Sequence, residues 1–155
     1  MKKIALKKGQ ILQRKGDLGS KIYQVEAGLL RSYSIDEKGK EHIFMFGPEG
    51  WIVADNLPKE EPSDLFIDAL EDSVVSVIEK DFTGEFDSLK LIRRLSVLQK
   101  RVIMLMSSSS LVRYEHFLKT YPDISQRVPQ KMIASYLGIT PEALSKIRGE
   151  QAKRK

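Results

Sequence analysis

The chain contains no cysteine, only two histidines, His42 and His116, and one tryptophan. The lack of cysteine excludes disulfides, thiol catalysis and cysteine-ligated iron–sulfur clusters, and it suits a reducing cytoplasm. A metal enzyme built on a small β domain needs several histidines, or histidines combined with carboxylates, around one ion. The two histidines lie far apart in the sequence, so each is better explained as a structural or surface residue. We therefore predict no metal site and no cofactor.

Other signals of catalysis and of membrane insertion are missing too. The sequence has no Gly-rich phosphate loop and no nucleophile motif, and Asp55 and Asp64 flank a predicted loop without a histidine near them. No apolar run reaches the ~18 residues that a membrane span needs. The start, MKKIALKKGQ, has no long apolar stretch behind its lysines, unlike a secretory signal. We expect a cytoplasmic protein that is not an enzyme, has no catalytic residues and has no membrane partner.

Positive charge is concentrated at one end of the chain. The 155 residues carry a formal net charge of +5. Residues 127–155 contain Arg127, Lys131, Lys146, Arg148, Lys153, Arg154 and Lys155 against Glu142 and Glu150, a surplus that equals the net charge of the whole chain. Such a segment is attracted to a phosphate backbone, and salt weakens the attraction. A solvated basic tail explains the last three basic residues equally well.

Residues 3 to about 80 are predicted to form short strands separated by glycine turns. The expected strands lie at residues 4–6, 11–12, 22–25, 29–35, 41–46, 65–70 and 74–78, with turns such as Lys15-Gly16-Asp17 and Gly47-Pro48-Glu49-Gly50 between them. Many short strands with glycine at most corners indicate a barrel or sandwich.

From about Phe86 the apolar period becomes helical. Apolar residues recur at sequence intervals of four, three, four and three positions. They are Leu91, Leu95, Leu98, Val102 and Leu105. This is an a/d seam of about two heptads, which favours a dimer interface. A helix buried wholly within its own chain is the alternative, because the seam is shorter than a persuasive coiled coil. Four serines, 107–110, are expected to end this helix. A second helix is expected to follow and to end at Pro122.

The most informative segment is Gln130 to Arg148, QKMIASYLGITPEALSKIR, which predicts two short helices joined by a turn. Pro129 is placed to open the first helix, and Gly138 ends it because glycine enters the left-handed conformation at little cost. Thr140 is a good N-cap for the second helix, with Pro141 at its first position. Leu144 and Ile147 then point inward. This is the plan of a helix-turn-helix, whose second helix enters the DNA major groove; the alternative is a helical hairpin that only packs a core.

Together these segments resemble the Crp/Fnr family of bacterial transcription regulators. The first half of the resemblance rests on Lys8-Gly9-Gln10, Arg14-Lys15-Gly16-Asp17, Ile22-Tyr23 and Glu26-Ala27-Gly28. The last part, from Arg113-Tyr114 through Tyr121-Pro122 to IASYLGITPEALSKIR, is similar to short members common in Bacteroidetes-type bacteria.

The resemblance implies an α+β chain in three parts. These are a double-stranded β-helix (jelly-roll) domain of the cyclic nucleotide-binding kind at 1–84, a dimerisation helix at 85–106 and a helix-turn-helix domain at 107–155. It also implies a homodimer that binds double-stranded DNA, with RNA polymerase as a candidate further partner. The sequence leaves little room for a β-hairpin after the second reading helix, so we expect no full wing.

The family pattern assigns roles to the outward residues of the two reading helices. Gln130, Lys131 and Thr140 are expected to contact phosphates, which position the protein without reading sequence. The pattern Glu-x-x-Ser-Arg appears here as Glu142 to Lys146, so Ser145 and Lys146 would reach bases or adjacent phosphates. Glu142 either accepts a hydrogen bond from cytosine or favours the positive helix end. The predicted DNA-contacting set is Gln130, Lys131, Thr140, Pro141, Glu142, Ser145, Lys146 and Arg148.

The sequence departs from relatives that bind cyclic nucleotides. Such members hold the ligand through Gly-Glu followed by Arg-Ser or Arg-Thr, but Gly50 is followed by Trp51, and Ser63-Asp64 replaces the arginine. The segment 59–62, KEEP, is net acidic and would repel an anion. We predict weak or no binding of cyclic AMP or cyclic GMP, and a pocket for an unidentified effector lined by Trp51, Asn56, Ser63 and Asp64. A ligand-binding regulatory module that acts through protein contacts alone is the alternative function.

Overall fold

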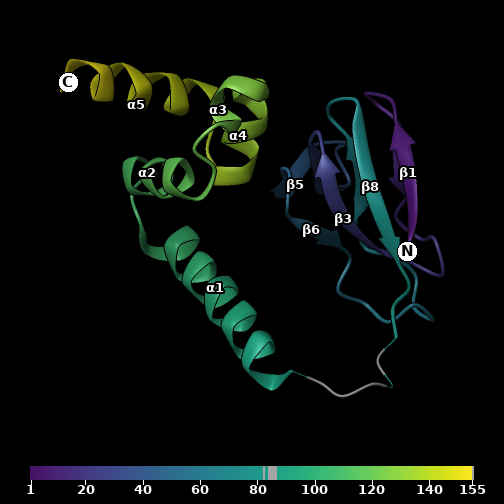
Figure 1. Ribbon diagram of the computed structural model, residues 1–155. Coiled ribbons are helices and arrows are strands. Elements are labelled where there is room, and N and C mark those ends of the chain that lie inside the picture. Colours follow the sequence, from purple (N-terminus) through teal and green to yellow (C-terminus); the bar gives the residue numbers. More distant parts are fainter. Residues whose placement is uncertain (82, 84–86, 155) are drawn as a thin grey trace. The chain divides into compact units, whose positions relative to one another are not determined.

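The computed structural model describes residues 1–81, 83 and 87–154 and divides into two compact units, Met1–Asp81 and Phe82–Lys155. The predicted boundary between residues 84 and 85, and the predicted helix start near Phe86, lie outside the described residues. Figure 1 shows strands in the first unit and helices in the second.

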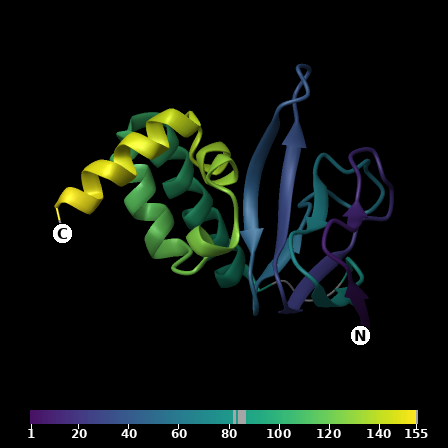
Figure 2. The same ribbon diagram turned by 90° about the horizontal axis from the view of Figure 1, so that it is seen from above.

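The first unit contains eight antiparallel strands in two sheets of four. The strands are β1 (Lys2–Leu6), β2 (Ile11–Gln13), β3 (Ile22–Ala27), β4 (Leu30–Ile35), β5 (Glu41–Gly47), β6 (Ile52–Ala54), β7 (Phe66–Ala69) and β8 (Ser73–Ile78). One sheet has the order β1-β8-β3-β6, and the other has the order β2-β7-β4-β5. Figure 2 shows the long hairpin formed by β4 and β5. The predicted β-sandwich character of this half is confirmed.

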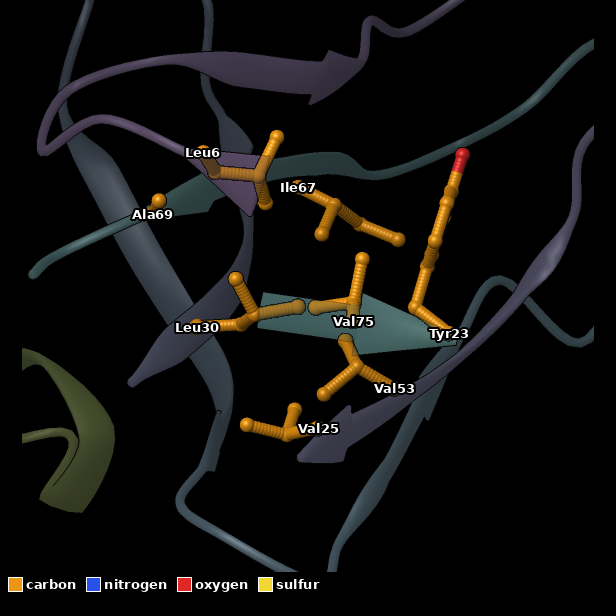
Figure 3. Packing of buried hydrophobic residues seen from close by; sticks show 8 residues of the cluster. All are labelled: Leu6, Tyr23, Val25, Leu30, Val53, Ile67, Ala69 and Val75. Atoms are coloured by element: carbon orange, nitrogen blue, oxygen red, sulfur yellow. The ribbon is translucent and has the colours of Figure 1, made fainter. Parts of the chain in front are cut away.

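The core of the β unit lies between its two sheets, because alternate side chains of each strand point to the same face. The buried cluster consists of Leu6, Tyr23, Val25, Leu30, Val53, Ile67, Ala69 and Val75 (Figure 3). Val53 belongs to β6, a strand that the sequence analysis did not predict. Three residues are too few for period-2 alternation to stand out, and the strand becomes visible only through its pairing with β3.

One close approach in the β unit depends on a glycine. A Cβ atom at Gly28 would lie 2.5 Å from the carbonyl oxygen of Asp72 and 2.7 Å from Cα of Ser73. The φ of Gly28 is +87°, a conformation that L side chains rarely adopt. The turn between β3 and β4 can therefore pass the start of β8 only because residue 28 has no side chain.

The second unit consists of helices α1 (Ser88–Ser107), α2 (Ser110–Thr120), α3 (Ile124–Arg127), α4 (Gln130–Leu137) and α5 (Pro141–Lys153). The serine break is shorter than predicted, because α1 continues through Ser107 and the side chain of Ser109 caps α2 at the N–H of Val112. Helices α2, α4 and α5 pack against one another. Helix α3 has only four residues, too short for the sequence periodicity to reveal it.

Candidate nucleic-acid interface

The turn between α4 and α5 is built by local capping. Gly138 has a φ of 65°, and the N–H of Ile139 donates to the carbonyl of Ala134 at 3.0 Å, which closes the end of α4. Oγ1 of Thr140 accepts a hydrogen bond from the N–H of Ala143 at 3.1 Å and so caps α5. These interactions agree with the turn that the sequence predicted. Pro129 differs slightly, since it occupies the N-cap of α4 and not its first helical position.

An apolar core holds α5 in place. Leu137, Leu144 and Phe117 are completely buried, and Ile147 is nearly so, as the sequence spacing predicted. Three rings, those of Phe117, Tyr121 and Tyr136, lie with their centroids 5.5–5.6 Å apart. Offset and edge-on aromatic pairs at such distances stabilise a core beyond simple area burial. The outward face of α5 is therefore presented by a helix with a fixed orientation in this unit.

Arg113 of α2 connects three segments of the helical unit. Its guanidinium donates to the carbonyls of Leu105, Ser108 and Leu137, at 2.6, 3.2 and 3.1 Å. Two of these carbonyls belong to the last turns of α1 and α4, where helices have carbonyl groups without an intrahelical partner. Arg113 therefore joins α1 to the turn that precedes α5, a role that its sequence position did not reveal.

A second contact joins α1 to α4. The guanidinium of Arg101 lies 4.1 Å from the centroid of the Tyr136 ring, within the range of a cation–π interaction. Met104, one turn further along α1, is the buried residue of this helix. One side of α1 is thus fixed on the bundle that carries α4 and α5.

The opposite side of α1 is uncovered in the helical unit. Of the five predicted seam residues, Leu91, Leu95 and Val102 are exposed, at 42%, 55% and 53%, while Leu98 and Leu105 are half-buried. The helix begins with a cap in which Asp87 accepts from the N–H of Lys90 at 3.1 Å, and this bond lowers the pKa of the Asp87 carboxyl group. Figure 1 shows α1 as one continuous helix. A long helix with an apolar stripe left uncovered by α2–α5 suits association with another apolar surface.

The outward face of α5 forms an open, shallow groove. It is lined by Glu142, Ser145, Lys146, Gly149, Glu150 and Lys153. Each of these residues lies three or four positions from another of the set, so they share one side of the helix. Gly149 leaves open space beside the helix, because a Cβ there would have no atom within 4 Å. Two glutamates and two lysines give the groove charges of both signs.

The predicted DNA-contacting residues fall into two groups. The structure brings Glu142, Ser145 and Lys146 together on the α5 groove. Thr140 and Pro141 lie at the start of α5, whereas Gln130 and Lys131 lie in the first turn of α4. These seven residues are all exposed, and Arg148 is half-buried. The spacing also places Gly149, Glu150 and Lys153 on the groove, and the sequence analysis had not included them.

The predicted effector pocket is not assembled in the same way. Ser63 is buried and Trp51 half-buried, but Asn56 and Asp64 are exposed. Oγ of Ser63 has no hydrogen-bond partner among the described residues, and the same holds for Oε1 of Gln13 and Oγ of Ser32. Gln13 and Ser32 are both paired in register with Ile67, on strands either side of β7. The interior of the β unit therefore has a polar part that the sequence analysis missed.

The part of the chain that the structure describes contains neither a candidate membrane span nor a cluster of metal ligands. None of the helices in this part is both long and apolar enough to cross a membrane. No group of three or more His, Cys, Asp or Glu side chains in residues 1–81, 83 and 87–154 is placed to hold a metal ion.

Comparison with known proteins agrees with this architecture. The family model described as "Cyclic nucleotide-binding domain" matches residues 3–86. The anaerobic regulatory protein of Haemophilus influenzae is 25% identical over 178 residues, which cover 98% of this chain and 67% of the relative. The fumarate and nitrate reduction regulatory protein of Vibrio cholerae is 28% identical over 173 residues, which cover 98% of this chain and 69% of the relative.

Solved structures share the fold across both units. FixK2 from Bradyrhizobium japonicum has a TM-score of 0.75 at 19% identity and covers 99% of this chain and 85% of its own. A CRP/FNR family transcriptional regulator from Thermus thermophilus has the same TM-score at 18% identity, with 99% and 87% covered. The chain belongs to the cyclic nucleotide-binding domain family. The resemblance to Crp/Fnr regulators is thereby confirmed.

Proposed function

We propose that the protein is a sequence-specific, DNA-binding transcriptional regulator of the Crp/Fnr type that acts as a homodimer in the cytoplasm. The main support is the α4–turn–α5 unit, in which Leu144 and Ile147 are buried while Glu142, Ser145 and Lys146 stay exposed on one face. The regulatory relatives match 98% of the chain, including this segment. In the proposed division, residues 1–84 sense, 85–106 dimerise and 107–155 bind DNA.

The proposed mechanism depends on geometry. Two copies of α5 must enter successive major grooves, which lie about one helical turn, roughly 34 Å, apart. Self-association through the α1 seam would set that spacing, and the contacts of Arg113 and Arg101 would transmit the position of α1 to α4 and α5. Surplus positive charge on residues 127–155 would draw this end of the protein to DNA.

Neutralising Lys146 is expected to weaken DNA binding several-fold and to reduce the slope of log affinity against log salt by about 1. The reason is that one fewer ammonium group would displace counterions from the duplex. The measurement is fluorescence anisotropy of Lys146→Gln on a selected genomic fragment between low and moderate salt. Lys38→Gln, which removes the same charge from the β4–β5 turn, is the control and should match the parent. An unchanged slope in Lys146→Gln would contradict a phosphate contact.

A triple change, Glu142→Ala, Ser145→Ala and Lys146→Ala, separates the two candidate functions. A DNA-reading α5 predicts that the preference for selected fragments over random competitor disappears, because base-edge contacts specify sequence. The exposed positions should leave the fold intact by circular dichroism. Retained preference would favour a regulatory module that acts through protein contacts.

Cyclic AMP is expected to bind weakly or not at all. The loop that follows β6 carries Glu60, Glu61 and Asp64 on its exposed surface, and these charges oppose an anionic ligand. Calorimetric titration of cyclic AMP into the protein should give no saturable heat at micromolar concentrations. A micromolar dissociation constant would refute this expectation.

A further inference from the structure

The loop between β6 and β7, residues 55–65, is closed by one of its own side chains. Asp55, only 3% exposed, opens this loop. Its Oδ1 accepts from the N–H of Leu57 at 3.1 Å, and its Oδ2 accepts from the N–H groups of Asp64 and Leu65 at 2.8 and 2.9 Å. A single carboxylate therefore binds both ends of the loop.

The three N–H groups all donate to one carboxylate, as the donors of an anion site do. Backbone N–H groups that converge on one point hold phosphates and other oxyanions in many proteins, and bonds to an ionised acceptor are stronger than neutral ones. In this chain a carboxylate of the protein itself already occupies that point. An external anion would have to displace Asp55 and leave a buried charge without its donors, which is costly.

The same loop is tied to the strand that ends the β unit. Lys80, two residues beyond β8, is 3% exposed. Its ammonium donates to the carbonyls of Asp55 and Leu57, at 2.6 and 2.7 Å, and to Oγ of Ser20 at 2.5 Å. An ammonium group has three protons, so these three acceptors satisfy it. Burial lowers the pKa of Lys80, and the nearby charge of Asp55 opposes this change.

We propose that Asp55 is a built-in anion that keeps the 55–65 loop closed without an external anionic ligand, and that Lys80 links the closed loop to the end of β8. The chain continues from Lys80 to Asp81, the last residue of the β unit. This inference rests on the proposed function and deepens it, because it states which side chain holds the 55–65 loop of the proposed sensing unit in its closed conformation. Its test uses no DNA, so it can fail while DNA binding stands.

The first measurement is thermal unfolding of Asp55→Ala. Loss of the carboxylate leaves three partly buried N–H groups without their acceptor, so the melting temperature should fall by at least about 5 °C. Sodium formate supplies the missing carboxylate, and it should restore part of this loss in a saturable way relative to sodium chloride of equal ionic strength. The wild-type protein should show no saturable gain with formate or inorganic phosphate.

Two control variants separate anion replacement from general effects. Asp64→Asn removes an equal charge from the same loop at an exposed carboxylate, and it should leave the melting temperature nearly unchanged. Lys80→Met should destabilise the protein without formate rescue, since the lost group is a cation. Formate rescue of Lys80→Met, equal stabilisation of the wild type, or an equal loss in Asp64→Asn would overturn the proposal.

If Asp55→Ala fails to fold, amide hydrogen exchange of the wild-type protein tests the proposal instead. The amide protons of Asp64 and Leu65 should exchange with deuterium as slowly as those of neighbouring strands, because buried Asp55 holds them. Rapid exchange at both amides would overturn the proposal.

Discussion

Replacing Leu95 by glutamate is expected to convert the protein to a monomer and to weaken its binding to a two-fold symmetric DNA site by about 100-fold or more. Leu95 is one of the three exposed residues of the α1 seam and is 55% exposed. In a parallel self-association the two glutamates would face each other in an apolar contact. Juxtaposed like charges cost several kcal/mol, and each 1.4 kcal/mol is about a factor of ten in affinity.

The measurement pairs light scattering with a DNA-binding assay on the same samples. Ser96→Glu is the matched control, since it adds the same charge one residue away, about 100° around the helix. It should remain dimeric and bind DNA like the parent. A dimeric Leu95→Glu variant with full DNA affinity would show that the α1 seam is not the self-association surface. A monomeric variant that still binds with full affinity would show that spacing two reading helices is not required.

Replacing Arg31 by methionine is expected to lower the free energy of unfolding by about 3–5 kcal/mol, the usual cost of leaving one partner of a buried pair uncompensated. Nε and Nη2 of Arg31 donate to the two carboxylate oxygens of Asp68 at 2.9 and 3.0 Å. The side chains of Arg31 and Asp68 are only 8% and 10% exposed. The guanidinium also pairs with Glu41 at 2.5 Å and lies 4.0 Å from the centre of the Tyr33 ring.

A double-mutant cycle tests this account of the pair. Arg31→Met with Asp68→Leu should recover most of the lost stability, because an apolar pair of similar volume often replaces a buried ion pair without cost. Glu41, whose side chain is 44% exposed, can be hydrated when its partner is removed. Urea unfolding gives the free energies. A double variant as unstable as Arg31→Met would show that the lost packing matters, and not the unpaired charge.

Much of the candidate site was predictable because its signals are local. Gly138, Thr140 and Pro141 end one helix and begin the next through bonds that span at most a few residues, so their order in the sequence is sufficient. The burial of Leu144 and Ile147 follows from helical spacing. The exposed face of α5 followed from the same reasoning, although it extends further, to Lys153, than the sequence analysis assigned.

The predicted effector pocket shows that local sequence signals do not give the orientation of loop side chains. Alignment with a family pattern placed Trp51, Asn56, Ser63 and Asp64 together, but two of the four are exposed in the structure. Whether a loop side chain points inward depends on the pairing of its flanking strands. Here β6 and β7 belong to different sheets, so no periodicity within the loop could indicate the side chains that enter the interior.

The sequence alone determined most of the strands and helices, though not β6 or α3, the alternation that buries one face of most strands, the apolar seam of α1 and the capped turn before α5. These features depend on contacts within a strand or a helical turn, whose spacing is written directly in the chain. The tertiary structure alone decided that Arg31 meets Asp68, that Arg113 binds the ends of α1 and α4, and that Asp55 and Lys80 close one loop. These partners are brought together by sheet pairing and helix packing across long stretches of chain. Many lysines and aspartates have the same local surroundings, so only the fold selects the few that become buried.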